Sequence, residues 1–146
     1  MDDIKKLLGR VNLFRGLDDY QLTRVAAITH AETFDTGEII FEQDDDGDKM
    51  YVVGSGQVEI KVKNETGDLH SVLILGQGQS FGEMALLDQG PRSASVVAIQ
   101  SHTILYALSG DHFKTLCASD TAIGYIMMRN IALDLSFKIR HQNLFS

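Results

Sequence analysis

Short apolar runs separated by glycines fill the middle of the chain, from residue 37 to residue 108, and this pattern restricts the possible folds most strongly. In residues 57–63, apolar and charged side chains alternate with the period of a half-buried strand. Residues 64–68 then have the composition of a hairpin turn, with Gly67 where a positive φ angle is expected. Many short strands with regular turn signals predict a sandwich, a barrel or a jelly roll.

Helical patterns flank this β-rich segment on both sides. Asp18 precedes a run with apolar residues at helical spacing and is a suitable N-cap. Ser109 is the corresponding candidate after the last strand. The sequence predicts helices at residues 2–9, 18–28, 109–117 and 121–142, and strands at residues 29–34, 49–54, 57–63, 69–75, 95–99 and 103–108.

No linker, repeat or low-complexity tract divides the chain, so we expect a single domain over residues 1–146. Its expected parts are N-terminal helices in residues 1–28, a β-roll in residues 29–108, and C-terminal helices in residues 109–146. The last helix carries apolar residues on more than one face. We therefore expect its second face to meet a ligand, another subunit or another protein.

The most distinctive motif lies within the β-rich segment, at residues 81–96. Gly82 allows the backbone to approach a ligand closely, and the start of a short helix at Glu83 offers free N–H groups to an anion. Arg92 adds a cation whose planar guanidinium suits phosphate oxygens. Because a carboxylate does not favour a phosphate, the expected partner of Glu83 is a hydroxyl group, such as that of a ribose.

This motif reads Phe-Gly-Glu-Met-Ala-Leu, a short loop, and then Pro-Arg-Ser-Ala-Ser-Val. It resembles the phosphate-binding cassette of cyclic nucleotide-binding domains of the catabolite activator protein and protein kinase A regulatory subunit type. Residues 12–17, 37–41 and 50–60 resemble the same family's opening turn and first strands. The resemblance implies a mainly β fold: an antiparallel β jelly roll (a double-stranded β-helix) with an N-terminal helical cap and two C-terminal helices.

The resemblance also implies roles for individual residues. Ser93 suits either cAMP or cGMP, and cAMP is favoured because bacterial-type domains with serine here resemble cAMP binders. The ligand is expected to be held without any cofactor. The expected phosphate contacts are Arg92, Ser93, Ala94, Ala85 and Met84; the expected ribose contacts are Glu83 and Gly82; and the candidate lid residues over the base are Arg129, Ile131 and Leu133.

The implied function is that of a sensor, not an enzyme, with no catalytic residues. Ligand occupancy would be passed through the C-terminal helices to a protein partner or to a second copy of the chain in a homodimer. Two alternatives remain open at this point: an interaction module that kept the fold without the ligand, and a cGMP-selective binder.

Other motifs in the chain are weaker. Ser80 lies in a Gly-x-Ser-x-Gly pattern, but the β-rich context does not suit a nucleophile elbow, so an esterase is a poor alternative. The acidic turn at residues 44–48 is not an EF-hand loop, because Val53 stands where a bidentate glutamate is required. The five histidines lack ligand spacing, and Cys117 suits a small core position, so no metal site is expected.

Bulk composition narrows the partners and the compartment. A net charge of −7 disfavours nucleic acid and anionic membrane surfaces. The chain has one cysteine, so it has no internal disulfide, and a reducing compartment is suitable. We find no membrane-length apolar run and no signal peptide at the start, and therefore expect the cytoplasm.

Overall fold

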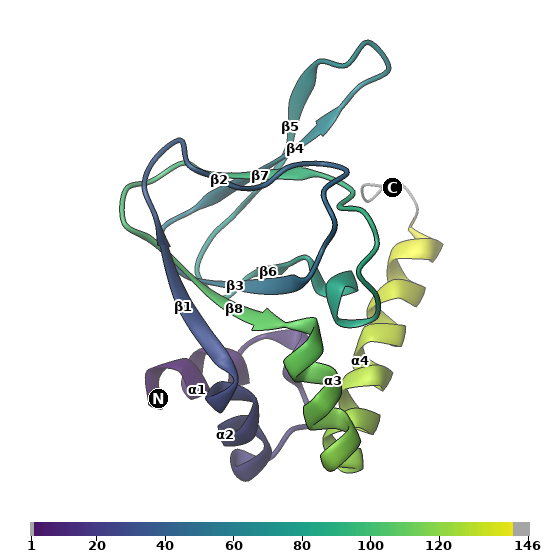
Figure 1. The fold of residues 1–146 in the computed structure, drawn as a ribbon. Coiled ribbons are helices and arrows are strands. Elements are labelled where there is room, and N and C mark those ends of the chain that lie inside the picture. Colours follow the sequence, from purple (N-terminus) through teal and green to yellow (C-terminus); the bar gives the residue numbers. More distant parts are fainter. Residues whose placement is uncertain (1, 142–146) are drawn as a thin grey trace.

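Two four-stranded antiparallel sheets form a β-roll in the computed structural model, which describes residues 2–141 (Figure 1). The strand order is β1-β8-β3-β6 in one sheet and β2-β7-β4-β5 in the other. This arrangement confirms the predicted jelly roll. The strands are β1 (Thr29–Phe34), β2 (Ile39–Phe41), β3 (Lys49–Ser55), β4 (Val58–Lys63), β5 (Leu69–Leu75), β6 (Ser80–Phe81), β7 (Ser95–Ala98) and β8 (Thr103–Ser109).

Helices cover one outer face of the roll and lie together below the β1-β8-β3-β6 sheet in Figure 1. Three of them begin with a side-chain N-cap, and two of these caps, Asp18 and Ser109, were predicted. Asp18 forms a reciprocal capping box with Gln21, and the side chains of Ser109 and Asp120 accept hydrogen bonds from the first turns of the last two helices. The helices are α1 (Asp2–Gly9), η1 (Asn12–Phe14), α2 (Asp19–Ala27), η2 (Glu83–Leu86), α3 (Gly110–Ser119) and α4 (Thr121–Arg140).

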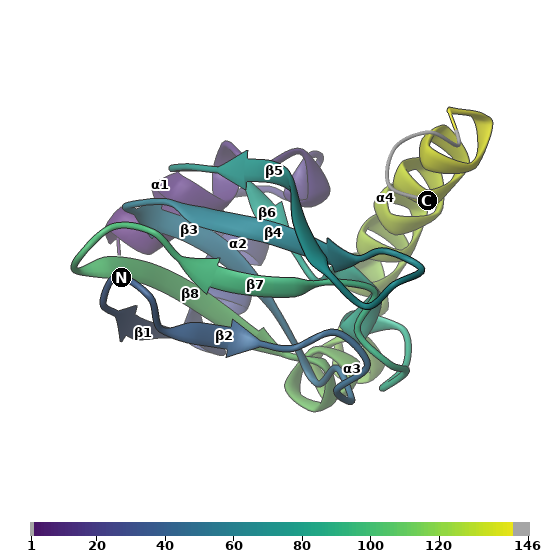
Figure 2. The same ribbon diagram turned by 90° about the horizontal axis from the view of Figure 1, so that it is seen from above.

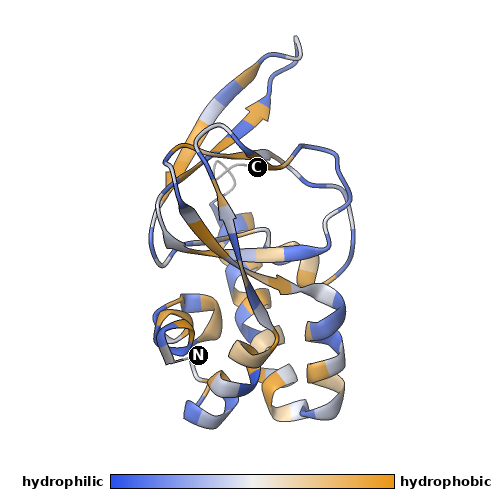
Figure 3. Cartoon of the chain, turned by 60° about the vertical axis from the view of Figure 1, so that its left-hand side comes forward, coloured by the Kyte–Doolittle hydropathy of each residue, from blue (hydrophilic) through white to orange (hydrophobic). Residues whose placement is uncertain are grey.

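Strand β3 separates two hydrophobic cores. Met50 and Val52 face the helices, whereas Tyr51 and Val53 face the interior of the roll. This follows from the alternation of side chains along a strand. Figure 3 shows that hydrophobic and hydrophilic residues are mixed along most elements. This is expected where one face of an element is buried and the other is exposed. Both layers therefore depend on the same central strand.

Most predicted boundaries agree with the structure to within one or two residues. Gly67 has φ of 86° in the β4–β5 turn, as predicted. Asp44 has φ of 75°, which shows that the aspartate adopts the left-handed conformation. The predicted helix after Ser109 extends past Cys117. Gln142, the predicted end of the last helix, lies outside the described residues.

Helix α4 runs along the side of the roll that carries the cassette (Figures 1 and 2). Its first three turns are anchored by fully or almost fully buried side chains. The helix also exposes apolar side chains along its length, as its mixed faces predicted. The buried residues are Ile123, Met127, Asn130 and Ile131, and the exposed apolar residues are Tyr125, Met128, Leu133, Phe137 and Ile139. Among the described residues, no helix combines the length and the apolar character needed to cross a membrane.

Candidate functional site

The loop that connects β2 to β3 holds the backbone of Arg92 in place. The N–H of Arg92 donates to the carbonyl of Asp45 at 2.7 Å, and the N–H of Asp44 donates to the carbonyl of Arg92 at 2.9 Å. Pro91 forms a β-bridge with Asp46 next to these bonds. The acidic turn at residues 44–48 thus holds the backbone of the cassette arginine in position.

The Arg92 side chain is buried, with 7% of its surface exposed. Its Nη2 donates to the carbonyl of Lys49 at 2.7 Å, and its Cζ lies 3.9 Å from the centre of the Phe41 ring. Its Nε is buried and has no hydrogen-bond partner, and Arg92 forms no ion pair with a carboxylate among the described residues. Burial lowers the pKa of the Arg92 guanidinium.

A buried cation without an anionic partner is unfavourable, because burial removes water that no protein group replaces. Arg92 has one good acceptor, the Lys49 carbonyl, for its five donors. The remaining donors can be satisfied by an anion with several oxygens. The site therefore has the electrostatics of a small-anion site.

Two glycines make room for this guanidinium. A Cβ atom on Gly82 would lie 2.7 Å from Nη1 of Arg92, and one on Gly47 would lie 3.0 Å from its Nε. Gly82 also has φ of 77°, a conformation that side chains disfavour. The sequence indicated Gly82, but it gave no sign that Gly47, within the acidic turn, would contact Arg92.

Three aromatic rings fill the roll interior beside the cassette. Tyr51 stacks on Phe81 with ring centres 5.2 Å apart, and Phe41 lies 5.9 Å from Phe81. Arg92 packs on this cluster through Phe41. Burial raises the pKa of the Tyr51 phenol. This aromatic cluster was not predicted as part of the site, because aromatic residues in strands are equally typical of any hydrophobic core.

Glu83 begins the short helix η2 and is bound by a residue that the sequence did not suggest. The Nζ of Lys138 in α4 donates to its Oε1 at 2.5 Å, and the same Nζ lies 3.1 Å from Oδ2 of Asp134. Only 12% of the Glu83 side chain is exposed. Burial acts to lower the pKa of Lys138, but the charge and hydrogen bond of Glu83, together with those of Asp134, outweigh it and raise the pKa.

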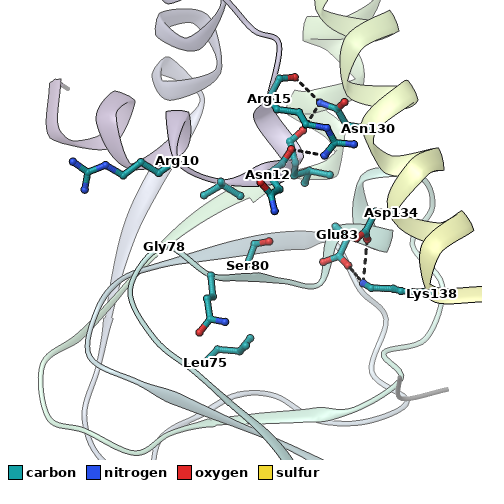
Figure 4. Close-up of a pocket in the computed structure, with 13 residues that line it drawn as sticks. Arg10, Asn12, Arg15, Leu75, Gly78, Ser80, Glu83, Asn130, Asp134 and Lys138 are labelled. Carbon is teal, nitrogen blue, oxygen red and sulfur yellow. Dashed lines mark hydrogen bonds and ion pairs between the residues drawn. The ribbon is translucent and has the colours of Figure 1, made fainter. Parts of the chain in front are cut away.

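A polar cavity of about 290 Å³ lies between α4, η1 and the turn before β6 (Figure 4). Glu83 and Lys138 face one another across one side of it. Arg92 does not line the cavity. Gly82, which immediately precedes Glu83 in the sequence, lies against the Arg92 guanidinium. The polar and charged lining residues are Arg10, Asn12, Arg15, Gln79, Ser80, Glu83, Asn130, Asp134 and Lys138.

The predicted phosphate contacts other than Arg92 differ in their exposure and in the use of their backbone amides. Ala94 is buried in the core of the roll, and Ser93 and Met84 are exposed. The N–H of Ala85 donates to the carbonyl of Gly82 at 3.1 Å, so that amide is occupied within η2. Their contacts with a ligand remain predictions.

The candidate lid residues of α4 lie away from the cavity. Ile131 is buried against the other helices, and Arg129 and Leu133 are exposed. Helix α4 instead presents Asn130, Asp134 and Lys138 to the cavity. The lid remains a prediction. Within residues 2–141, no cluster of His, Cys, Asp and Glu could hold a metal ion.

Known proteins are similar to this chain in both sequence and fold. A family model described as the cyclic nucleotide-binding domain matches residues 31–120. The cyclic AMP receptor protein of Thermus thermophilus is 33% identical over 132 residues, which cover 90% of this chain and 59% of that protein. A cAMP-dependent protein kinase regulatory subunit of Dictyostelium discoideum is 32% identical over 130 residues, with 87% and 38% covered.

A cGMP-dependent protein kinase of Caenorhabditis elegans is also similar, with 31% identity over 115 residues that cover 77% of this chain and 15% of that protein. Among solved structures, the N-terminal domain of a transcriptional regulator from Streptomyces coelicolor A3(2) superimposes with a TM-score of 0.82. It is 28% identical, and the match covers 90% of this chain and 94% of that one.

The chain spans less than two thirds of the length of these curated relatives, and 59% of the Thermus protein. The family match nevertheless includes the whole cassette and the β-roll after β1 begins. The predicted resemblance is confirmed: the chain belongs to the cyclic nucleotide-binding domain family.

Proposed function

We propose that this domain binds cAMP in preference to cGMP and that Arg92 binds the cyclic phosphate. The observation that carries the proposal is the buried Arg92 guanidinium without an anionic partner. A 3′,5′-cyclic phosphate has one negative charge and two free oxygens, which suit one guanidinium with unused donors. The ligand would also move the charge of Arg92 from an uncompensated to a compensated state.

In this proposal Glu83 accepts a hydrogen bond from the ribose 2′-hydroxyl. Its carboxylate is mostly buried and lies beside the cavity, one residue from Gly82, which contacts Arg92. The cassette thus presents a cation for the phosphate and an acceptor for the sugar in adjacent positions. Arg129, Ile131 and Leu133 would reach the base only after a movement of α4, because none of them faces the cavity.

The preference for cAMP rests on the relatives whose names include cAMP, since the exposed Ser93 hydroxyl suits either base. The similarity to a cGMP-dependent kinase keeps the alternative testable. A direct measurement is therefore the ratio of the two affinities in the same preparation.

We further propose that the domain is a cytoplasmic regulatory module that is not itself catalytic. Occupancy would reach a protein partner, or a second copy of the chain, through the exposed apolar side chains of α4. The net charge of −7 favours these partners over nucleic acid or an anionic membrane. An ester-hydrolysis assay comparing the protein with Ser80→Ala would expose an esterase by activity lost in the variant.

Isothermal titration of cAMP and of cGMP into protein that has been denatured, stripped of ligand and refolded tests the proposal. We expect saturable binding, tighter for cAMP. Arg92→Ala should weaken it by about ten- to a hundred-fold, because a hydrogen bond to a charged group contributes roughly 1.5–3 kcal/mol. Arg140→Ala, which removes an exposed cation of α4, is the matched control.

Circular dichroism must show that Arg92→Ala remains folded, since Arg92 also packs on Phe41. Unchanged affinity in the folded variant would refute the assignment of the phosphate site. Absence of binding of both nucleotides to the refolded wild-type protein would favour the interaction module that kept the fold.

A further inference from the structure

The carboxylate proposed for the ribose is paired with a lysine of α4. Lys138, 55 positions further along the chain, places its Nζ 2.5 Å from Oε1 of Glu83. Both side chains line the same cavity, so the ammonium group stands in the space beside the carboxylate (Figure 4). A hydroxyl group that approaches Glu83 from this cavity must displace Lys138 or share the carboxylate with it.

Lys138 also has a second partner to which it can remain bound. Asp134 lies one helical turn earlier in α4 and is 3.1 Å from the same Nζ. When Lys138 leaves Glu83, its charge is still paired within its own helix. Breaking the contact with Glu83 therefore costs little free energy, because the lysine keeps one carboxylate partner. A low cost is required if a ligand is to displace the contact.

The end of α4 depends on this ion pair more than the rest of the helix does. The last nearly fully buried residue of the helix is Ile131, and Leu135 is only partly buried. Beyond Leu135, the ion pair with Glu83 is the one side-chain hydrogen bond or ion pair between α4 and the rest of the fold that the described residues show. Loss of this contact would release the final turn.

We propose that Lys138 is an internal competitor for the ribose site, which holds the end of α4 against the cassette until a cyclic nucleotide takes Glu83. This inference rests on the proposed function and adds its regulation. It makes Lys138 the residue that sets the threshold for occupancy. Ligand binding would then release the end of α4, because a Glu83 carboxylate bound to the ribose no longer holds Lys138.

Lys138→Met tests the competition, because methionine keeps an unbranched apolar stem and removes the charge. We expect the affinity for cAMP to increase by about two- to five-fold, the range expected for a partly exposed ion pair. Arg140→Met is the matched control: it removes a cation from the same final segment, changes the net charge equally, and is expected to leave the affinity unchanged. Weaker binding in Lys138→Met would show that the lysine contacts the ligand, and unchanged binding would show no competition; either result overturns the proposal.

Hydrogen–deuterium exchange on the ligand-free protein separates this proposal from the proposed function. Amides of residues 136–140 should exchange faster in Lys138→Met than in wild type, whereas Arg140→Met should match wild type. Equal exchange in Lys138→Met and wild type would overturn the docking role, whatever the nucleotide does. Failure of wild type to bind either nucleotide would instead refute the proposed function, and the exchange result would still decide whether Lys138 holds the helix end.

Discussion

Arg92 occupies its buried position because two neighbouring residues have no side chain. The guanidinium fits between Gly47 and Gly82, and a Cβ atom at either position would lie within 3.0 Å of one of its nitrogens. Its backbone is fixed separately by the hydrogen bonds with Asp44 and Asp45. The direction of the cation is thus set by steric space, and its position by the loop after β2.

Gly82→Ala should therefore weaken ligand binding by displacing the guanidinium, by up to about the ten- to hundred-fold expected for Arg92→Ala. A positive φ at an alanine costs roughly 1–2 kcal/mol, so part of the effect will be on stability. Gly67→Ala is the matched control: Gly67 also has a positive φ, of 86°, but nothing lies within 4 Å of the added Cβ. Urea denaturation and nucleotide titration of both variants check the prediction.

We expect a comparable loss of unfolding free energy in the two variants but weaker binding only in Gly82→Ala. Binding in Gly82→Ala as tight as in Gly67→Ala would mean that the guanidinium can move aside without loss of the site. The close approach of Gly82 to Arg92 would then not be needed for ligand binding.

At the scale of elements, α4 is fixed to the helical layer at its start. Asp120 caps α4 by accepting from the N–H of Ile123 at 3.2 Å through Oδ1. Its Oδ2 forms an ion pair with Nη1 of Arg24 in α2, at 3.0 Å. One carboxylate thus both begins the helix and connects it to α2, leaving the other end of α4 to the ion pair with Glu83.

Asp120→Ala should reduce the free energy of unfolding by about 1–2 kcal/mol. Loss of an N-cap costs about 1 kcal/mol and loss of a partly exposed ion pair about 0.2–1 kcal/mol. Arg24→Met, which removes only the ion pair, should show the smaller cost alone. Urea denaturation measures both values. Equal destabilisation by the two substitutions would show that the cap contributes nothing to α4.

Local patterns were sufficient to predict these elements. Asp18 and Ser109 were identified as caps because capping depends on residues two or three positions apart. The alternation in β4 likewise predicted its strand. The predicted jelly roll followed from the number and spacing of such strands and was confirmed.

Lys138 and Gly47 could not be found in this way. Their roles arise from contacts with Glu83 and Arg92, which lie far from them in the chain and come close only in the folded protein. In the sequence, Lys138 is one basic residue among others on a helix with mixed faces. The cassette was predictable because its residues are close in sequence, whereas the groups that control it are not.

At the scale of the whole molecule, β3 joins the two layers into one structure. Val52 packs with the helices and Val53 with the roll interior, and both are almost completely buried. Strand β8 is divided in the same way, with Leu108 in the helical core and Leu105 in the roll. Neither layer can keep its core if this sheet is lost, so we propose that the described residues form one cooperative unit.

This arrangement predicts that Val52→Ala and Val53→Ala each lower the stability of both layers together. Each substitution removes about two buried methyl groups, which corresponds to about 2 kcal/mol at roughly 0.8 kcal/mol per buried CH₂ with a small cavity cost. Hydrogen exchange in increasing urea, followed separately in α2 and in β4, should give coincident transitions in wild type and equal shifts in each variant. Val72→Ala, at a position that is 42% exposed on β5, should move neither transition by a comparable amount.

If Val53→Ala lowered the transition of β4 and left α2 at its wild-type midpoint, the roll would be an independent unit. In that case a nucleotide bound at the cassette could influence the helices only through contacts such as that between Glu83 and Lys138, because the shared strand would not couple them.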